Sequence, residues 1–209
     1  MQPCPLCNSS STPYYLHIIR QFLQCGNCLS VFLHPKDHLS QEAEKYHYLQ
    51  HNNDPEDARY QQFLSPVVNA VLRDFGPEHE GLDFGSGTGS PIMKLLTDAK
   101  YNISEYDLFF HNYPELLQNR YNYITCSETA EHFKEPHKEF RQLRNLLKPG
   151  GKLYVYTDRF DPDRDFGTWY YKTDATHVFL YHARAFEWIM SEFNFSRLEF
   201  DGRLAVLSV

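Results

Sequence analysis

The sequence lacks a long apolar segment, and it lacks an excess of positive charge. No apolar run reaches the roughly 18 residues of a membrane-spanning helix, and residues 1–7 have neither the basic nor the apolar part of a secretory signal. We therefore expect a soluble, cytoplasmic protein with no membrane span. The 20 basic and 27 acidic residues give a formal net charge of −7, which disfavours a nucleic-acid partner.

The length of 209 residues leaves room for one α/β domain with a small appendage. It is too short for two full domains of about 100 to 200 residues each. Hydrophobic residues make up 42% of the chain, which is enough for a sizeable core. The sequence carries no signature of the oligomeric state.

Cysteine is scarce, yet four of the five cysteines form two C-x2-C pairs, Cys4 with Cys7 and Cys25 with Cys28. This spacing is typical of structural zinc, in which four thiolates hold one ion tetrahedrally and leave no open position for catalysis. Iron, disulfides or free thiols are the alternatives, and a reducing compartment disfavours disulfides. Short strands around the pairs predict a zinc ribbon over residues 1–38. The ribbon has one arginine and no lysine before Lys36, so it lacks the basic face of a nucleic-acid finger.

Residues 39–78 are predicted to form a linker followed by a helix. Asp54 is a suitable N-cap with Pro55 at the first helical position, and Ser65-Pro66 predicts a break within the helix. A polar and aromatic cluster in this segment is compatible with either a lid over a ligand pocket or a solvated linker. Its members are His47, His51, Asn52, Asn53 and Tyr60.

A glycine-rich turn follows a short apolar run in residues 81–91, GLDFGSGTGSP. Pro91 stands where the first position of a helix would fall, so the pattern predicts a strand, a tight turn and a helix. Such a turn lets the backbone approach a nucleotide-like cofactor closely. A dinucleotide fingerprint would require glycine at position 90, which is Ser90. An ordinary loop between a strand and a helix is the less favoured alternative for the turn taken alone.

Asp107 supports the cofactor interpretation. It ends a predicted strand over residues 101–107 and lies 22 residues after Gly85. An acid at about this offset binds the ribose hydroxyls in nucleotide-binding α/β units. Further along, residues 121–126 predict a strand, Pro136 opens a helix, and a K-P-G-G turn leads into a strand over 152–157.

In this fixed order of motifs, residues 81–157 resemble the class I S-adenosylmethionine-dependent methyltransferases. The resemblance is to small bacterial enzymes of the ubiquinone-biosynthesis type, here with an N-terminal zinc-ribbon head. It implies an α/β, Rossmann-like, mostly parallel sheet of six or seven strands over residues 79–209, closed by a C-terminal antiparallel hairpin around Asp201-Gly202. Only 13 residues separate Asp107 from Tyr121, so one edge of the sheet is expected to be abbreviated.

The resemblance also implies which residues contact S-adenosylmethionine. Asp107 would bind the ribose, Leu108 would pack on the adenine, and Cys126 and Ser127 would lie beside the transferred methyl group. The glycine-turn contacts implied in this way are Asp83, Gly85, Ser86, Gly87, Thr88 and Gly89. Cys126 is also interpretable as a small buried thiol.

Three side chains are candidates for handling the methyl acceptor. Glu128 and His132 follow the strand over 121–126, and His177 lies in an unusually long segment rich in aromatics and acids, residues 158–181. His177 is our first choice for a general base, because imidazole can take a proton near neutral pH. Structural hydrogen bonding is the alternative for both histidines, and many methyl transfers need only alignment and desolvation.

We therefore expect methyl transfer to a small-molecule acceptor. Zinc-headed relatives include sugar methyltransferases and a ribosomal-RNA guanine methyltransferase, so the head leaves the acceptor undecided. An RNA-modifying enzyme is one rival, against which the net negative charge argues. A non-catalytic module that binds the cofactor or zinc without turnover is the other.

Overall fold

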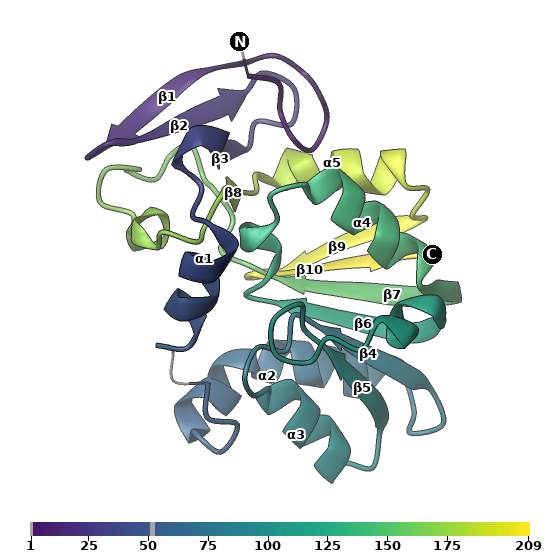
Figure 1. Cartoon of the computed structure of the whole chain (residues 1–209). Coiled ribbons are helices and arrows are strands. Elements are labelled where there is room, and N and C mark those ends of the chain that lie inside the picture. The colour runs from purple at the N-terminus through teal and green to yellow at the C-terminus, as the bar shows by residue number, and fades with distance from the viewer. Residues whose placement is uncertain (1, 51–52) are drawn as a thin grey trace.

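A six-stranded sheet, with strand order β5-β4-β6-β7-β10-β9, forms the centre of the computed structural model, which describes residues 2–50 and 53–209. Figure 1 shows helices on both faces of this sheet, α2 and α3 on one side and α4 and α5 on the other. The strands are β4 (Glu80–Phe84), β5 (Asn102–Tyr106), β6 (Tyr121–Ser127), β7 (Leu147–Tyr156), β9 (Arg197–Asp201) and β10 (Leu204–Ser208). The helices are α2 (Ala58–Asp74), α3 (Pro91–Asp98), α4 (Pro136–Asn145) and α5 (Ala183–Glu192).

The sheet is parallel on one side and antiparallel on the other. β4 pairs in parallel with β5 and β6, and β6 pairs in parallel with β7. β10 runs antiparallel to both β7 and β9, and Gly202 takes a positive φ of 54° in the turn of the final hairpin. The predicted Rossmann-like sheet and its closing hairpin are confirmed. The shorter, six-stranded version is observed, because the chain between β5 and β6 forms only a 3-10 turn over Pro114–Gln118.

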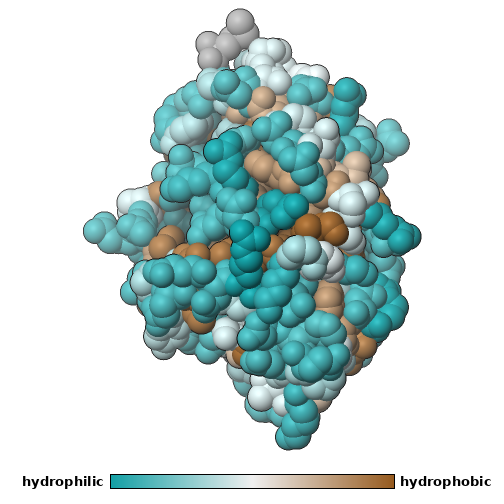
Figure 2. All heavy atoms as spheres, turned by 90° about the vertical axis from the view of Figure 1, so that its right-hand side faces the viewer, coloured by the Kyte–Doolittle hydropathy of each residue, from teal (hydrophilic) through white to brown (hydrophobic). Residues whose placement is uncertain are grey.

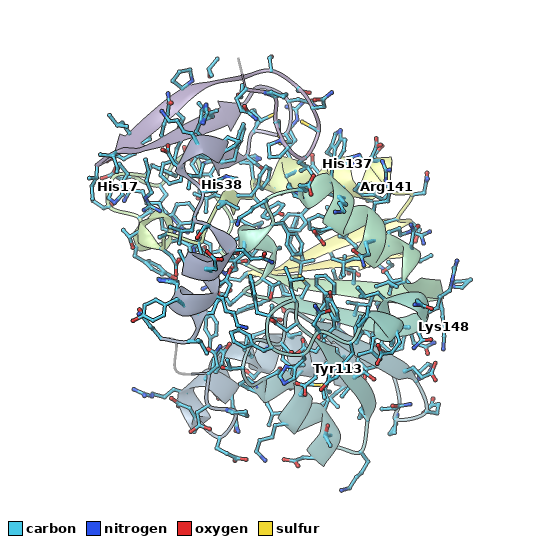
Figure 3. The ribbon with its side chains drawn as sticks, viewed as in Figure 1. His17, His38, Tyr113, His137, Arg141 and Lys148 are labelled. Carbon is cyan, nitrogen blue, oxygen red and sulfur yellow. The ribbon has the colours of Figure 1, made fainter. Side chains whose placement is uncertain are left out.

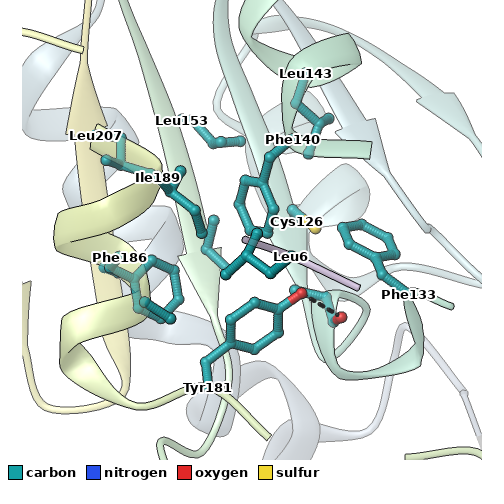
Figure 4. Close-up of a cluster of buried hydrophobic side chains, with 14 of the residues drawn as sticks. Leu6, Cys126, Phe133, Phe140, Leu143, Leu153, Tyr181, Phe186, Ile189 and Leu207 are labelled. Atoms are coloured by element: carbon teal, nitrogen blue, oxygen red, sulfur yellow. Dashed lines mark hydrogen bonds between the residues drawn. The ribbon is translucent and has the colours of Figure 1, made fainter. Parts of the chain in front are cut away.

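Burial of both sheet faces explains the apolar character of the central strands. Ile124 and Leu153 face the core under α4 and α5, whereas Tyr123 and Tyr154 face α2 and α3. Figure 4 shows the core under α4 and α5, where Phe140 of α4, Phe186 of α5 and Tyr181 pack together beside the sheet. Here Tyr181 donates a hydrogen bond to the carbonyl of Ala130 at 3.0 Å.

The helix over residues 58–74 corrects two sequence predictions. The N-cap is Asp57, whose carboxylate accepts from the Arg59 amide at 2.8 Å, and Asp54 instead caps the preceding turn. α2 also continues through Pro66 without a break. Proline cannot donate to the carbonyl four residues earlier, and the Ser65 hydroxyl donates to that carbonyl, on Gln62, at 2.8 Å. The exchange of donors preserves the helix.

The N-terminal ribbon consists of three antiparallel strands, β1 (Ser11–His17), β2 (Arg20–Cys25) and β3 (Val31–Leu33). A fourth strand, β8 (Phe179–Leu180), comes from the segment after β7 and pairs antiparallel with β3. The ribbon is followed by a 3-10 turn over Pro35–Asp37 and by α1 (Gln41–Tyr48), a helix that the sequence analysis did not predict. The ribbon sheet is therefore completed by residues distant in the sequence.

Leu6 ties the ribbon to the methyltransferase-like core. Its side chain is 1% exposed and packs in the same buried cluster as Phe140, Tyr181 and Phe186. Figure 4 shows Leu6 between these side chains, and Figure 1 shows the ribbon against the layer formed by α4 and α5. The ribbon and the larger domain thus share one hydrophobic core.

Within residues 2–50 and 53–209, every helix is too short or too polar to cross a lipid bilayer. The face seen in Figure 2 is covered mainly by hydrophilic side chains, with small apolar areas between them.

Shortening Leu6 tests the shared core. We expect Leu6→Ala to lower the free energy of unfolding by about 2–5 kcal/mol, because it removes a buried side chain and leaves a cavity. Urea denaturation measures this, with Leu16→Ala as the control on the same ribbon. Leu16 is 66% exposed, so its truncation should change stability by no more than about 0.5 kcal/mol. Equal effects of the two substitutions would show that Leu6 does not anchor the ribbon.

Candidate active site

A cavity of about 1210 Å³ opens at the carboxyl ends of β4, β5 and β6, where open α/β sheets bind ligands. The loops after these strands form its floor, and α1 and the segment after β7 form its sides. The volume exceeds the roughly 300–1,000 Å³ of most small-molecule sites. The cavity is therefore large enough for two ligands side by side.

The glycine turn forms one end of the cavity. Gly85 and Gly87 both have positive φ, 85° and 63°, which favours glycine at these two positions. A Cβ on Gly85 would lie 2.2 Å from the Thr129 side chain, so the close approach of the two loops also requires glycine. The amides of Gly85 and Ser86 donate to the carbonyl of Tyr106, which ties the turn to β5. Gly85, Ser86 and Gly87 all line the cavity.

Asp107 lies beside this turn, as its register in the sequence predicts. One carboxylate oxygen accepts from the Gly87 amide at 2.9 Å, and the other accepts from the amides of Phe109 and Phe110. These bonds fix the carboxylate at the cavity wall, next to Leu108. The arrangement can present a carboxylate to a pair of ribose hydroxyls while an apolar wall faces an attached base.

Not all of the predicted cofactor contacts reach the cavity. Asp83 is 3% exposed and accepts hydrogen bonds from the hydroxyls of Ser90 and Thr125, both at 2.6 Å. Because Ser90 is the N-cap of α3, Asp83 positions that helix on the sheet. Cys126 is fully buried in the core. This position agrees with the interpretation of Cys126 as a small buried thiol. Thr88 and Gly89 border a separate shallow hollow beside α3.

Ser127 does line the cavity, at the end of β6. Its hydroxyl is buried and has no hydrogen-bond partner among the described residues. A buried hydroxyl without a partner is unfavourable, so this atom is well suited to bind a ligand.

The three acceptor candidates also line the cavity, and the part of its wall that they form is named the acceptor end. Glu128 pairs with Arg203 at 2.7 Å. The rings of His132 and His177 lie in edge contact, with centroids 4.8 Å apart. Burial and, to a smaller extent, the neighbouring His132 together lower the pKa of His177 to about 4, so His177 is neutral at pH 7.

Sequence reasoning missed several residues at this end. Glu131 is fully buried behind His132 and accepts hydrogen bonds from the hydroxyls of Tyr171 and Thr157. Arg203, from the final hairpin, and Asp174 also line the cavity. The sequence places Glu131 next to His132, but it contains no signal that this carboxylate is buried, because its hydroxyl partners come from distant segments.

The described members of the polar cluster in residues 47–60 lie at or near the cavity. Asn53 and Tyr60 line the wall together with Tyr48 of α1, and His47 contacts the Asp174 carboxylate at 3.2 Å. This placement favours the lid over the solvated linker. His51 and Asn52 lie outside the described residues.

The four paired cysteines converge in the ribbon. Cys4 Sγ lies 3.7 Å from Cys28 Sγ, and Cys7 Sγ lies 3.4 Å from Cys25 Sγ, and none of the four is in a disulfide. A tetrahedron of Zn–S bonds of about 2.3 Å has S···S edges of about 3.8 Å, so this thiol cluster fits a zinc ion. The Cys25 sulfur also accepts from the amides of Asn27 and Cys28, as a thiolate can.

This combination of a parallel sheet, a glycine turn with a neighbouring acid and a closing antiparallel hairpin defines the Rossmann-like fold of class I methyltransferases. The family model described as "Methyltransferase domain" matches residues 56–199. The chain therefore belongs to the methyltransferase domain family.

Among curated proteins, the ubiquinone biosynthesis O-methyltransferase of Coxiella burnetii is 34% identical over 77 residues, which cover 34% of this chain and 33% of that protein. The Proteus mirabilis protein of the same name is 26% identical over 102 residues, 44% of this chain and 37% of that protein. The chain thus spans about a third of the length of the curated relatives that it matches.

Two solved structures from Burkholderia thailandensis share the fold. A 1,6-didemethyltoxoflavin-N1-methyltransferase, with bound 1,6-didemethyltoxoflavin and S-adenosylhomocysteine, has a TM-score of 0.54 and 13% identity over 94% of this chain and 96% of its own. An O-methyltransferase family protein has a TM-score of 0.55 and 14% identity over 81% of this chain and 62% of its own.

The pH dependence of stability tests the buried position of Asp83. Burial, together with the charges of Glu105 and Asp107, raises the pKa of Asp83 to about 6, although the Ser90 and Thr125 hydroxyls partly oppose the shift. Because this pKa is above that of an unfolded aspartate, the stability that a protonated Asp83 contributes is lost as the pH rises through 6. Between pH 7.5 and 5.5, the stability of the wild type should therefore increase by about 1 kcal/mol relative to Asp83→Asn.

Urea denaturation at the two pH values measures this difference, and histidine titration cancels because both proteins share it. Asp98→Asn is the matched control, since Asp98 is at the end of α3 with an exposed side chain and a lowered pKa. The difference in free energy of unfolding between Asp98→Asn and the wild type should be the same at both pH values. If the difference between Asp83→Asn and the wild type is also independent of pH, the raised pKa of Asp83 is contradicted.

Proposed function

We propose that the protein transfers a methyl group from S-adenosylmethionine to a small-molecule acceptor. The observation that carries this proposal is the bond between the Gly87 amide and Asp107 in a cavity that Glu128, His132 and His177 also line. The glycine-turn end has the groups that a nucleoside requires, and the acceptor end has groups that can accept a proton.

The residues of the first end fit the cofactor. Asp107 would accept hydrogen bonds from the ribose hydroxyls, and Leu108 would pack on the adenine together with the neighbouring Phe109. Ser127, whose hydroxyl has no partner among the described residues, and the backbone of the glycine turn would hold the amino-acid part. When bound, the cofactor supplies a methyl group made electrophilic by its sulfonium.

The residues of the second end would bind and orient the acceptor. Tyr60, Phe63 and Tyr170 give it an aromatic wall, and the Glu128–Arg203 pair adds fixed polar groups. His132 or His177 would take the acceptor's proton. Holding the acceptor in line with the methyl group, away from bulk water, lowers the barrier through alignment and desolvation. The bound 1,6-didemethyltoxoflavin of the Burkholderia thailandensis enzyme and the curated relatives named for ubiquinone biosynthesis support this choice.

Calorimetric titration with S-adenosylmethionine tests the cofactor site. We expect micromolar binding, no binding of NADH, and at least tenfold weaker binding by Asp107→Ala, because the ribose would lose its carboxylate partner. Asp98→Ala is the control, since this exposed aspartate lies outside the cavity. Binding of NADH in preference to S-adenosylmethionine, or equal binding by Asp107→Ala and the wild type, would refute the proposed site.

We further propose that Cys4, Cys7, Cys25 and Cys28 hold one structural zinc ion, and that the ribbon is a fixed part of the enzyme in the cytoplasm. Elemental analysis should find this zinc, and blocking the thiols with an organomercurial should release one equivalent per chain. Cys28→Ser should lose that equivalent and unfold at a lower temperature, because the metal closes a ribbon with little core of its own. Thiols that react fully without releasing metal would contradict a zinc site.

A further inference from the structure

The acceptor end of the cavity contains a second group of potential metal ligands. Glu131, His132 and His177 each offer one ligand atom, and these atoms all lie within 4.8 Å of one another. His132 and His177 line the cavity, and Glu131 lies directly behind them. No function described so far requires the buried carboxylate.

Both imidazoles are held in one tautomer. His177 Nδ1 lies 2.7 Å from the Tyr171 carbonyl, and His132 Nδ1 lies 3.0 Å from the Thr176 carbonyl. A carbonyl only accepts, so each Nδ1 must carry a hydrogen, and Nε2 is the nitrogen that has the lone pair in the neutral ring. Metal-binding histidines are oriented in this way, with the second ring nitrogen donating to a carbonyl or carboxylate.

The third ligand is a carboxylate that lacks a cationic partner. Glu131 is fully buried, and none of the lysines and arginines in the described ranges forms an ion pair with it. Its Oε1 lies 4.0 Å from His177 Nε2. The hydroxyls of Tyr171 and Thr157 orient the carboxylate. Glu128, in contrast, lies 2.7 Å from Arg203 and is outside the cluster.

We propose that Glu131, His132 and His177 bind a divalent transition-metal cation at the acceptor end of the cavity. Two imidazoles and one carboxylate suit manganese, iron or zinc, and three ligands leave positions open to the cavity. The loops that carry them are already joined, because the Val178 amide donates to the Glu131 carbonyl at 2.8 Å. Metal–ligand bonds of about 2.0–2.2 Å would draw the three ligand atoms closer together than they lie in the metal-free cluster.

If the protein is the proposed methyltransferase, the cation also indicates the chemical class of the methyl acceptor. An open coordination position attracts an oxygen donor, and a cation lowers the pKa of a bound hydroxyl. The acceptor would then be a hydroxyl compound that binds the cation as its oxyanion and releases the proton to water. With the cation bound, the two histidines would hold it through Nε2, so release of the proton to water would replace the histidine base proposed for the metal-free site.

Manganese binding to the full-length, zinc-loaded protein tests the site. Mn²⁺ has little affinity for thiolates, so it should leave the cysteine cluster unchanged. Electron paramagnetic resonance should count one bound Mn²⁺ per chain, and one added equivalent of Zn²⁺ should displace it. Glu131→Gln and His177→Gln should each bind Mn²⁺ at least tenfold more weakly.

His17→Gln is the control, because His17 lies on the ribbon, as labelled in Figure 3, and does not line the cavity. It should bind Mn²⁺ as the wild type does. If the two buried variants do not fold, His132→Gln gives the same test, since His132 is only half-buried. Thermal unfolding establishes which variants are folded.

Absence of bound Mn²⁺ in the wild type, or equal binding by the ligand variants and the wild type, would overturn the proposal. Titration of S-adenosylmethionine without added metal separates this outcome from failure of the proposed function. Cofactor binding without Mn²⁺ binding would remove the cation and leave the methyltransferase proposal intact.

Discussion

Parallel pairing of β4 with β5 and β6 is the constraint on which the cavity depends. Parallel strands end at the same edge of a sheet, so three separate loops meet there: the glycine turn, the Asp107 loop and residues 127–132. Their contact is tight enough that Thr129 occupies the space of a Cβ on Gly85. The hydrogen bond from Gly87 to Asp107 then joins two of the loops directly.

The second sheet gives the ribbon a structural role at the acceptor end of the cavity. β3 pairs with β8, and the Leu33 amide donates to the carbonyl of Val178, the residue after His177. Val178 in turn donates to Glu131. A ribbon held by its cysteine cluster would therefore hold the loop that carries His177. This link explains how a small appendage without a basic surface can contribute to a binding site.

Three carboxylates in or near the cavity wall are each satisfied differently. Asp83 accepts from two hydroxyls and joins α3 to the sheet, so its position is structural. Glu128 is balanced by Arg203. Glu131 has hydroxyl partners but no cation among the described lysines and arginines, and a buried carboxylate in that state favours a bound positive ion.

The sequence alone determined features encoded by local spacing. The glycine turn, the offset of Asp107, the cysteine pairs and the final hairpin each depend on a short segment whose backbone conformation or ligand geometry allows few alternatives. Tertiary structure decided the rest: the pairing of β8 with the ribbon, the burial of Glu131, the position of Arg203 in the cavity wall and the packing of Leu6 in the core. These features arise from contacts between segments far apart in the sequence, such as Val31 with Leu180 and Leu6 with the core around Phe186. No local pattern specifies which distant side chain will complete a site.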